Sequence, residues 1–154
     1  MAETKTKIQR NTSLHIIQIA ALIGFLDSLY LTYIKVFNAP IYCTPGLGDC
    51  DVVNASRYSI LFGIPLAVYG MIGFGLVFLI TLLDKEHTFI AEYQNLMLFG
   101  ISFAGFLFSL YLTYLEAFVI RAFCQWCVLS AIAMTVIFIT TIVRLVVKSP
   151  SNKH

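Results

Sequence analysis

The stretch Cys124-Gln-Trp-Cys127 lies between two long apolar runs, residues 96–118 and residues 128–147. Two cysteines three positions apart at the start of a helix lie within reach of each other. The positive end of the helix dipole also favours the thiolate form of a cysteine placed there. This spacing suits a reversible dithiol/disulfide couple, although it also serves structural disulfides and zinc sites. Because the next helix is apolar enough to enter a bilayer, the motif predicts a redox pair at the edge of a membrane.

The composition is that of an integral membrane protein. Of the 154 residues, 59% are hydrophobic and only 12% are charged, and a soluble domain of this size would not carry so few charges. About 20 helical residues cross the hydrocarbon core of a bilayer. Four runs reach that length: residues 14–37, 62–83, 95–118 and 124–147. We therefore expect an all-α bundle of four transmembrane helices that forms a single domain over residues 1–154.

Basic residues set the expected orientation in the membrane. Three basic residues precede the first run, three more lie at the end of the fourth run or beyond it, and the turn at residues 84–92 adds Lys85. The cysteine-bearing side holds three. Since basic segments tend to stay in the cytoplasm, we expect both termini there, in a cell inner or plasma membrane. All four cysteines then lie on the extracytoplasmic side, where disulfides persist. The net charge of +2 gives no argument for a nucleic-acid partner.

The sequence contains an internal repeat. Residues 24–33, GFLDSLYLTY, return as residues 105–114, GFLFSLYLTY, with nine identities in ten positions. The same offset of 81 residues places Cys43 on Cys124. We interpret the first and third spans as parallel copies of one helix, each leading outward to a cysteine. Because the third span of a bundle usually lies beside the first, we expect these two cysteines to meet.

A second cysteine pair lies in the polar loop of residues 38–61. In Cys43-Thr-Pro-Gly-Leu-Gly-Asp-Cys50, one proline and two glycines prevent a regular helix and permit movement. A mobile dithiol facing a fixed one is the layout of a relay, in which each transfer is a thiolate attack on a disulfide. Two alternatives remain open on these residues. One is a non-catalytic four-span protein with two structural disulfides, and the other is a zinc site built from the cysteines.

The order of these features resembles the vitamin K epoxide reductase family over nearly the whole chain. The features are the loop cysteine pair, Ser56 after it, Phe62-Gly-Ile-Pro-Leu-Ala-Val-Tyr-Gly70, and Cys124-Gln-Trp-Cys127 opening the fourth helix. The resemblance implies a four-helix bundle around a quinone, either ubiquinone or menaquinone, without a metal. Prokaryotic members oxidise periplasmic thioredoxin-like proteins of the DsbA type and reduce a membrane quinone. The sequence carries no fused thioredoxin-like domain, so we expect the thiol partner to be a separate protein.

By position, the resemblance assigns a role to each cysteine. Cys127 resembles the quinone-facing cysteine, and Cys124 resembles the one that exchanges disulfides. Cys43 and Cys50 resemble the relay pair. The expected electron path runs from the partner to Cys50, through Cys43 to Cys124, and from Cys127 to the quinone, because Cys50 is expected to be freer to meet a soluble protein. Ser56 matches a serine that helps to close the quinone site.

The sequence departs from the animal enzymes of this family at the quinone oxygens. Those enzymes place a tyrosine and an asparagine there, whereas the tyrosine position corresponds here to Ala131. The asparagine position corresponds to Ser59 or to Leu66, depending on whether the match is anchored on Phe62-Gly63 or on Gly70. Because neither residue is an asparagine, we expect a plain quinone as the electron acceptor. Reduction of vitamin K epoxide is the alternative.

Three charged residues need a separate interpretation. Asp27 falls near the middle of the first span, where a charge is costly, so a proton-handling role stands against a polar packing contact. Glu116 and Arg121 are expected near the outer surface, where they can pair with each other.

Overall fold

The computed structural model of the protein describes residues 1–83 and 88–148. Its elements are α1 (Ala2–Phe37), α2 (Cys50–Ala55), the 3₁₀ turn η1 (Arg57–Ser59), β1 (Ile60–Leu61), β2 (Ile64–Pro65), α3 (Leu66–Leu83), α4 (Thr88–Tyr114), the π-helical turn η2 (Leu115–Ile120) and α5 (Gln125–Lys148). Four segments, which centre on α1, α3, α4 and α5, are long and apolar enough to cross a membrane. The predicted all-α fold with four membrane-spanning helices is therefore confirmed.

The core of the bundle forms where α1 packs against α3 and α5. The buried α1 residues Ile17, Ala20 and Ala21 are spaced three and four positions apart, so they share one face of the helix. They belong to one hydrophobic core cluster with Val77 of α3 and Ile137 of α5. Small residues on this face let the neighbouring helices approach closely, as is common between membrane helices.

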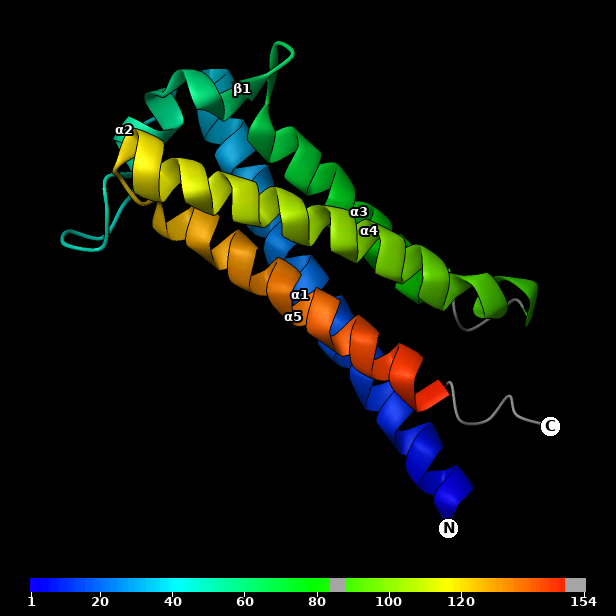
Figure 1. Ribbon diagram of the computed structural model, residues 1–154. Helices are drawn as coiled ribbons and strands as arrows, with labels where there is room; N and C mark the ends of the chain where they lie inside the picture. Colours follow the sequence, from blue (N-terminus) through cyan, green and yellow to red (C-terminus); the bar gives the residue numbers. More distant parts are fainter. Residues whose placement is uncertain (84–87, 149–154) are drawn as a thin grey trace.

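The two helices that carry the internal repeat lie at opposite corners of the bundle (Figure 1). Both α1 and α4 pack mainly against α3 and α5. The expectation that the first and third spans are neighbours is therefore wrong. Both copies nevertheless point the same way, and the N-terminus and the end of α5 lie at the opposite end of the bundle from the loop after α1 (Figure 1).

The second span begins later than the sequence predicts. Residues 60–65 form a two-stranded hairpin in which Leu61 pairs with Ile64, and α3 begins only at Leu66. The turn residues Phe62 and Gly63 both have positive φ, 52° and 80°, which is the geometry of a tight hairpin turn rather than a helix. The predicted start at residue 62 is wrong because Phe-Gly is a weak turn signal beside the usual Asn-Gly. Pro65 accordingly lies in a strand and not in a first helical turn.

The other boundaries lie close to those predicted. Residues 2–13 extend α1 ahead of the predicted first span, and α5 begins one residue after the predicted start. In the predicted turn at residues 84–92, the chain is helical from Thr88, and residues 84–87 lie outside the described residues. Both copies of the repeat lead to a left-handed residue, Asn38 (φ 49°) after α1 and Arg121 (φ 57°) after η2. The chain therefore turns sharply just before each cysteine-bearing segment.

Candidate active site

The structure gathers the four cysteines of the chain into one cluster. Cys50 and Cys124 are each 1% exposed and belong to its buried core, and Cys43 and Cys127 pack against them. Cys43 and Cys50 form a disulfide with their Cα atoms 5.9 Å apart, while Cys124 and Cys127 are free thiols. The two pairs are thus in contact and in different redox states. A zinc site of four thiolates does not match this arrangement, because two of the sulfurs are bonded to each other.

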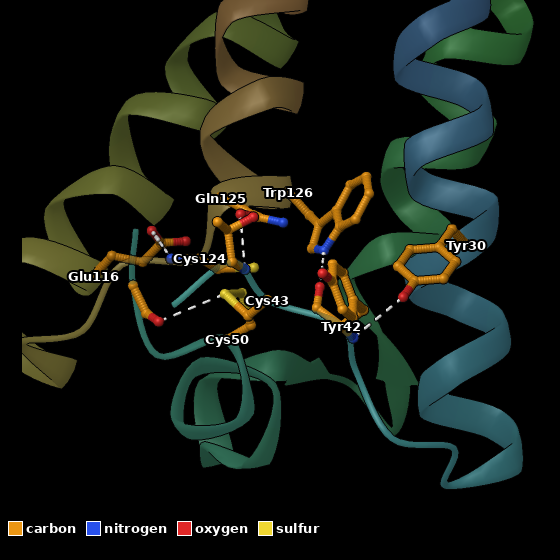
Figure 2. Close-up of a disulfide and its surroundings, with 10 residues drawn as sticks. Tyr30, Tyr42, Cys43, Cys50, Glu116, Cys124, Gln125 and Trp126 are labelled. Atoms are coloured by element: carbon orange, nitrogen blue, oxygen red, sulfur yellow. Dashed lines mark hydrogen bonds between the residues drawn. A yellow bond between two sulfur atoms is a disulfide. The ribbon is translucent and has the colours of Figure 1, made fainter. Parts of the chain in front are cut away.

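The loop that carries the disulfide is docked on the start of α5 (Figure 2). Three hydrogen bonds join them: Thr44 N–H to Gln125 Oε1 at 3.2 Å, Trp126 Nε1–H to the Tyr42 carbonyl at 2.9 Å, and Asp49 N–H to the Phe123 carbonyl at 3.0 Å. The irregular segment predicted from its proline and glycines is present. It is nevertheless hydrogen-bonded to the segment that contains the second cysteine pair. The loop residues in these bonds, Tyr42, Thr44 and Asp49, each neighbour a cysteine of the disulfide.

Gly48 permits this close docking. Its φ is +138°, and a Cβ added there would lie 2.2 Å from the Phe123 carbonyl oxygen, a distance that no side chain tolerates. Gly46 also has a positive φ, +86°, but a Cβ added there would meet open space. Of the two loop glycines, Gly48 is therefore the one that the contact with α5 requires.

Cys124 occupies the N-terminal cap of α5. Its carbonyl accepts the Val128 N–H at 3.0 Å, as expected of the residue before the first helical turn. The pKa of Cys124 is lowered, chiefly by the hydrogen bond from the Cys127 thiol and further by the backbone N–H groups of Cys127 and Trp126. Burial and the nearby Glu116 act in the opposite direction. Cys124 is thus the more acidic thiol of the pair, in line with its position at a helix N-terminus.

Glu116 contacts both cysteines of the helix pair. It lies in the π-helical turn η2, is 5% exposed, and its Oε2 accepts the Cys124 N–H at 3.3 Å. Its carboxylate is also hydrogen-bonded to the Cys127 thiol. The expected surface pair with Arg121 is wrong, and no such ion pair occurs within the part of the chain that the structure describes. Sequence reasoning did not foresee the π-helical turn, and it therefore missed the contact of Glu116 with the cysteines.

A cavity of about 530 Å³ opens between the helices beside the cysteine cluster. Cys124, Cys127 and Glu116 line it. The residues predicted to bind a quinone also line it: Ser56, Ser59, Leu66, Cys127 and Ala131. The volume lies within the range of small-molecule sites, and the remaining wall is mostly apolar. The cavity therefore fits a quinone, while the roles of individual residues stay predictions.

The polar end of this cavity is already hydrogen-bonded. The Ser56 hydroxyl donates to the Val53 carbonyl at 2.8 Å, and the Ser59 hydroxyl faces the carbonyls of Asn54 and Ser56, each at 2.8 Å. Lys35 Nζ donates to Ser59 Oγ at 2.8 Å and also to the Asn54 carbonyl. In this state Ser56 offers a ligand its oxygen as an acceptor, not a donated hydrogen. Sequence reasoning used Lys35 only as a charge, although a basic residue ending the first span was a signal for it.

Asp27 ties α1 to α5 deeper in the bundle. The side chain is 4% exposed, and its Oδ2 accepts a hydrogen bond from Ser130, which lines the cavity one helical turn below Cys127. Its other oxygen, Oδ1, has no hydrogen-bond partner among the residues that the structure describes. The contact with Ser130 supplies the polar packing that the sequence left open for this residue.

Comparison with known proteins places this site in a family. The model of the vitamin K epoxide reductase family matches residues 15–142. The chain is also similar to the thiol-disulfide oxidoreductase LTO1 of Arabidopsis thaliana, with 35% identity over 111 residues, or 69% of this chain. The match spans only 30% of the length of that relative. The family match covers all four cysteines and all or most of each membrane-spanning helix, and the chain belongs to the vitamin K epoxide reductase family.

Proposed function

We propose that this protein is a membrane thiol–quinone oxidoreductase that generates disulfides outside the cytoplasm. It would reoxidise a separate thioredoxin-like protein of the DsbA type and pass the electrons to a membrane quinone. The observation that carries the proposal is the contact between a loop disulfide and a helix dithiol on the wall of an apolar cavity. The relative's name, a thiol-disulfide oxidoreductase, supports the same class of reaction.

The order of electron transfer follows from the burial of the four sulfurs. The expectation that Cys50 is the freer loop cysteine is wrong, because Cys50 is 1% exposed and Cys43 is partly exposed. The partner's thiolate therefore attacks Cys43, which releases the Cys50 thiolate. Cys50 then attacks Cys124 of an oxidised helix pair and releases the Cys127 thiolate. The partner's second thiol frees Cys43, which closes the loop disulfide again and leaves Cys124 and Cys127 reduced.

The redox states in this structure match one stage of that cycle. An oxidised loop beside a reduced helix pair is what remains after electrons have moved inward and before an acceptor removes them. When bound in the cavity, a quinone supplies the chemistry of a two-electron acceptor. The residues that would hold it are Cys127 at one wall, the apolar side chains of α3 and α4, and the polar end at Lys35.

Turnover with purified components tests the activity. Purified protein is mixed with a reduced thioredoxin-like protein and either ubiquinone or a menaquinone, and the quinone absorbance is followed. We expect reduction of at least one quinone and formation of the partner disulfide. A parallel arm with vitamin K epoxide tests the alternative acceptor. If neither acceptor is reduced and both pairs resist a glutathione-range redox buffer, the cysteines form structural disulfides and the proposal fails.

The orientation is a separate part of the proposal. Basic residues favour cytoplasmic termini, and the cysteine-bearing loop lies at the other end of the bundle from the N-terminus (Figure 1). We therefore place the cysteines on the extracytoplasmic face of the plasma or inner membrane. After mild reduction of intact cells, an impermeant thiol reagent should label Cys43. Labelling that occurs only after the membrane is broken would show that the topology is the opposite one.

A further inference from the structure

We propose that Glu116 is the proton acceptor of the helix pair, taking the proton of Cys127 when Cys124 and Cys127 form their disulfide. This inference rests on the redox role proposed above, but its chemistry concerns only the three side chains. Glu116 touches a reacting thiol directly, so the role assigned to it is that of a catalytic base.

The contacts around Cys127 carry the inference. The thiol of Cys127 lies between two acceptors, the sulfur of Cys124 and the carboxylate of Glu116. The same carboxylate is fixed at the other side, since its Oε2 accepts the Cys124 N–H at 3.3 Å. Because the Glu116 side chain is 5% exposed, bulk water has little access to the proton that it faces. A base held within hydrogen-bond reach of the proton is the geometry that general base catalysis needs.

The backbone around Glu116 keeps the carboxylate in this place. The π-helical turn Leu115–Ile120 ends at Arg121, and the Ala122 N–H closes it by donating to the Glu116 carbonyl at 3.1 Å. Turns of this kind are frequently found at functional sites. Within residues 1–83 and 88–148 the Glu116 carboxylate forms no ion pair, and its hydrogen bonds go to Cys124 and Cys127. The carboxylate is therefore committed to the redox pair and not to a structural salt bridge.

The redox step balances with Glu116 in this role. With Cys124, the more acidic thiol, as the thiolate, the reduced pair holds one proton, on Cys127. Forming the Cys124–Cys127 bond releases two electrons and that proton. The electrons pass to the acceptor and the proton passes to the Glu116 carboxylate, which lines the same cavity. A quinone reduced there would take one of its two protons from Glu116 and the other from water. Glu116 then takes up a new proton, released when the partner's thiols are oxidised, and passes it to Cys127 when the loop reduces the helix pair again.

A small disulfide separates the two thiols kinetically without any quinone. In a Cys43→Ala/Cys50→Ala background only the helix pair remains, and 2,2′-dithiodipyridine oxidises it in two steps. The Cys124 thiolate releases the first thiopyridone, and Cys127 releases the second only after it loses its proton. We expect Glu116→Gln to leave the first phase within about twofold and to slow the second by about 100-fold near neutral pH. Glutamine still accepts the Cys124 N–H, so the local fold is retained.

The pH profile distinguishes a base from a merely structural group. With Glu116 present, the second phase should be nearly independent of pH around neutrality. In Glu116→Gln it should rise with pH as hydroxide replaces the missing base, and Glu116→Asp should restore part of the plateau. Asp51→Asn removes an exposed carboxylate in α2 and should change neither phase. Parallel profiles for Glu116→Gln and the unchanged protein, or equal slowing of both phases, would overturn the inference.

Quinone turnover then separates this inference from the proposed function. If the second phase slows as expected but the parent protein reduces no quinone, the acceptor is wrong and the role of Glu116 stands. If the parent reduces quinone and Glu116→Gln matches it in both the second phase and turnover, the function stands and Glu116 is not the base.

Discussion

The two copies of the repeated helix, residues 24–33 in α1 and 105–114 in α4, differ most in the segments to which they connect. After α1 the chain turns at Asn38 and runs as an irregular loop to Cys43, which is oxidised. After α4 it widens into η2, turns at Arg121 and delivers Cys124 to the cap of a helix, where the cysteine is reduced. Nearly identical helices thus lead to a disulfide on a loop and to a free thiol at the start of a helix. The difference between the two copies lies in the connecting segments.

The two copies of the repeat differ in sequence at one position, which is Asp27 in the first copy and Phe108 in the second. Asp27 of the first copy is bonded to Ser130 of α5, whereas its mate Phe108 lines the cavity. The first copy is therefore fastened into the bundle core, and the second serves as a wall of the cavity. An exchange of function between the copies would need changes both in this position and in the connecting segments.

Breaking the sulfur relay on either side of the repeat should give the largest effect. Cys127→Ser should abolish quinone reduction and accumulate a Cys50–Cys124 mixed disulfide, because no second helix thiol resolves it. In Cys50→Ser the loop has no disulfide, so Cys43 can only attack the disulfide of an oxidised partner, and the partner should stay trapped on Cys43 when its own second cysteine is also replaced. Non-reducing electrophoresis followed by peptide mapping identifies each bond. A partner found on Cys124 in the unchanged protein would show that the loop is bypassed.

Loosening the loop from α5 should give the next largest effect. Gly48→Ala places a methyl group against the Phe123 carbonyl, whereas Gly46→Ala meets open space. Both variants carry the strain of a positive φ, about 1–3 kcal/mol each, and Gly48→Ala adds the clash with the carbonyl. We expect a soluble dithiol to reduce the Cys43–Cys50 disulfide about tenfold faster in Gly48→Ala than in Gly46→Ala. Equal rates would mean that the docked loop does not limit access.

The repeat also offers a matched pair of glycines. A Cβ on Gly24 would lie 2.4–2.6 Å from the ring of Phe74, which is buried, while a Cβ on Gly105 would meet the flexible end of Met134 at 2.7 Å. An aromatic ring in a packed core moves aside less easily than the end of a methionine side chain. Gly24→Ala should therefore lower the free energy of unfolding by about 1–3 kcal/mol, and Gly105→Ala should lower it clearly less. Thermal unfolding in detergent measures both. Equal losses would mean that the two copies are packed alike.

The parts of the fold that the sequence predicted are those set by composition and local spacing. Apolar runs of sufficient length identify the four helices, and the offset between the copies placed Cys43 and Cys124 at one end of the bundle. The contact between the pairs was predicted for the wrong reason, since α1 and α4 are not neighbours. The loop folds back onto α5 instead, through hydrogen bonds such as that from Trp126 to the Tyr42 carbonyl. Sequence spacing does not encode such long-range contacts.

The missed parts of the site depend on backbone irregularities. Glu116 reaches the cysteines through a π-helical turn, and the hairpin at residues 60–65 needs a positive φ at Phe62, a residue that rarely adopts one. Lys35 reaches the cavity because its long side chain bends toward Asn54 and Ser59 of a segment distant in sequence. Each depends on tertiary packing that overrides local propensity. Of the three, only Lys35 has a sequence signal, a basic residue at the end of the first span, and that signal does not place its side chain at the cavity.

The matched tyrosines of the repeat should show the smallest effect. Tyr30 packs its ring on Trp126, with centroids 4.8 Å apart, and its hydroxyl oxygen accepts the Tyr42 N–H at 3.3 Å. Because the Tyr42 carbonyl in turn accepts the Trp126 Nε1–H at 2.9 Å, these three residues clasp the chain just before Cys43. The mate of Tyr30 in the second copy, Tyr111, is 55% exposed on the apolar surface.

Tyr30→Phe keeps the stacked ring and removes one hydrogen bond, worth about 0.5–1.5 kcal/mol. Loop release should therefore become easier by roughly two- to tenfold, seen as faster reduction of the Cys43–Cys50 disulfide by a soluble dithiol. Tyr111→Phe makes the same chemical change at the equivalent position without touching the loop, so its rate should match that of the unchanged protein. If Tyr111→Phe accelerated reduction as much as Tyr30→Phe does, the effect would come from the membrane-facing helices rather than from the clasp.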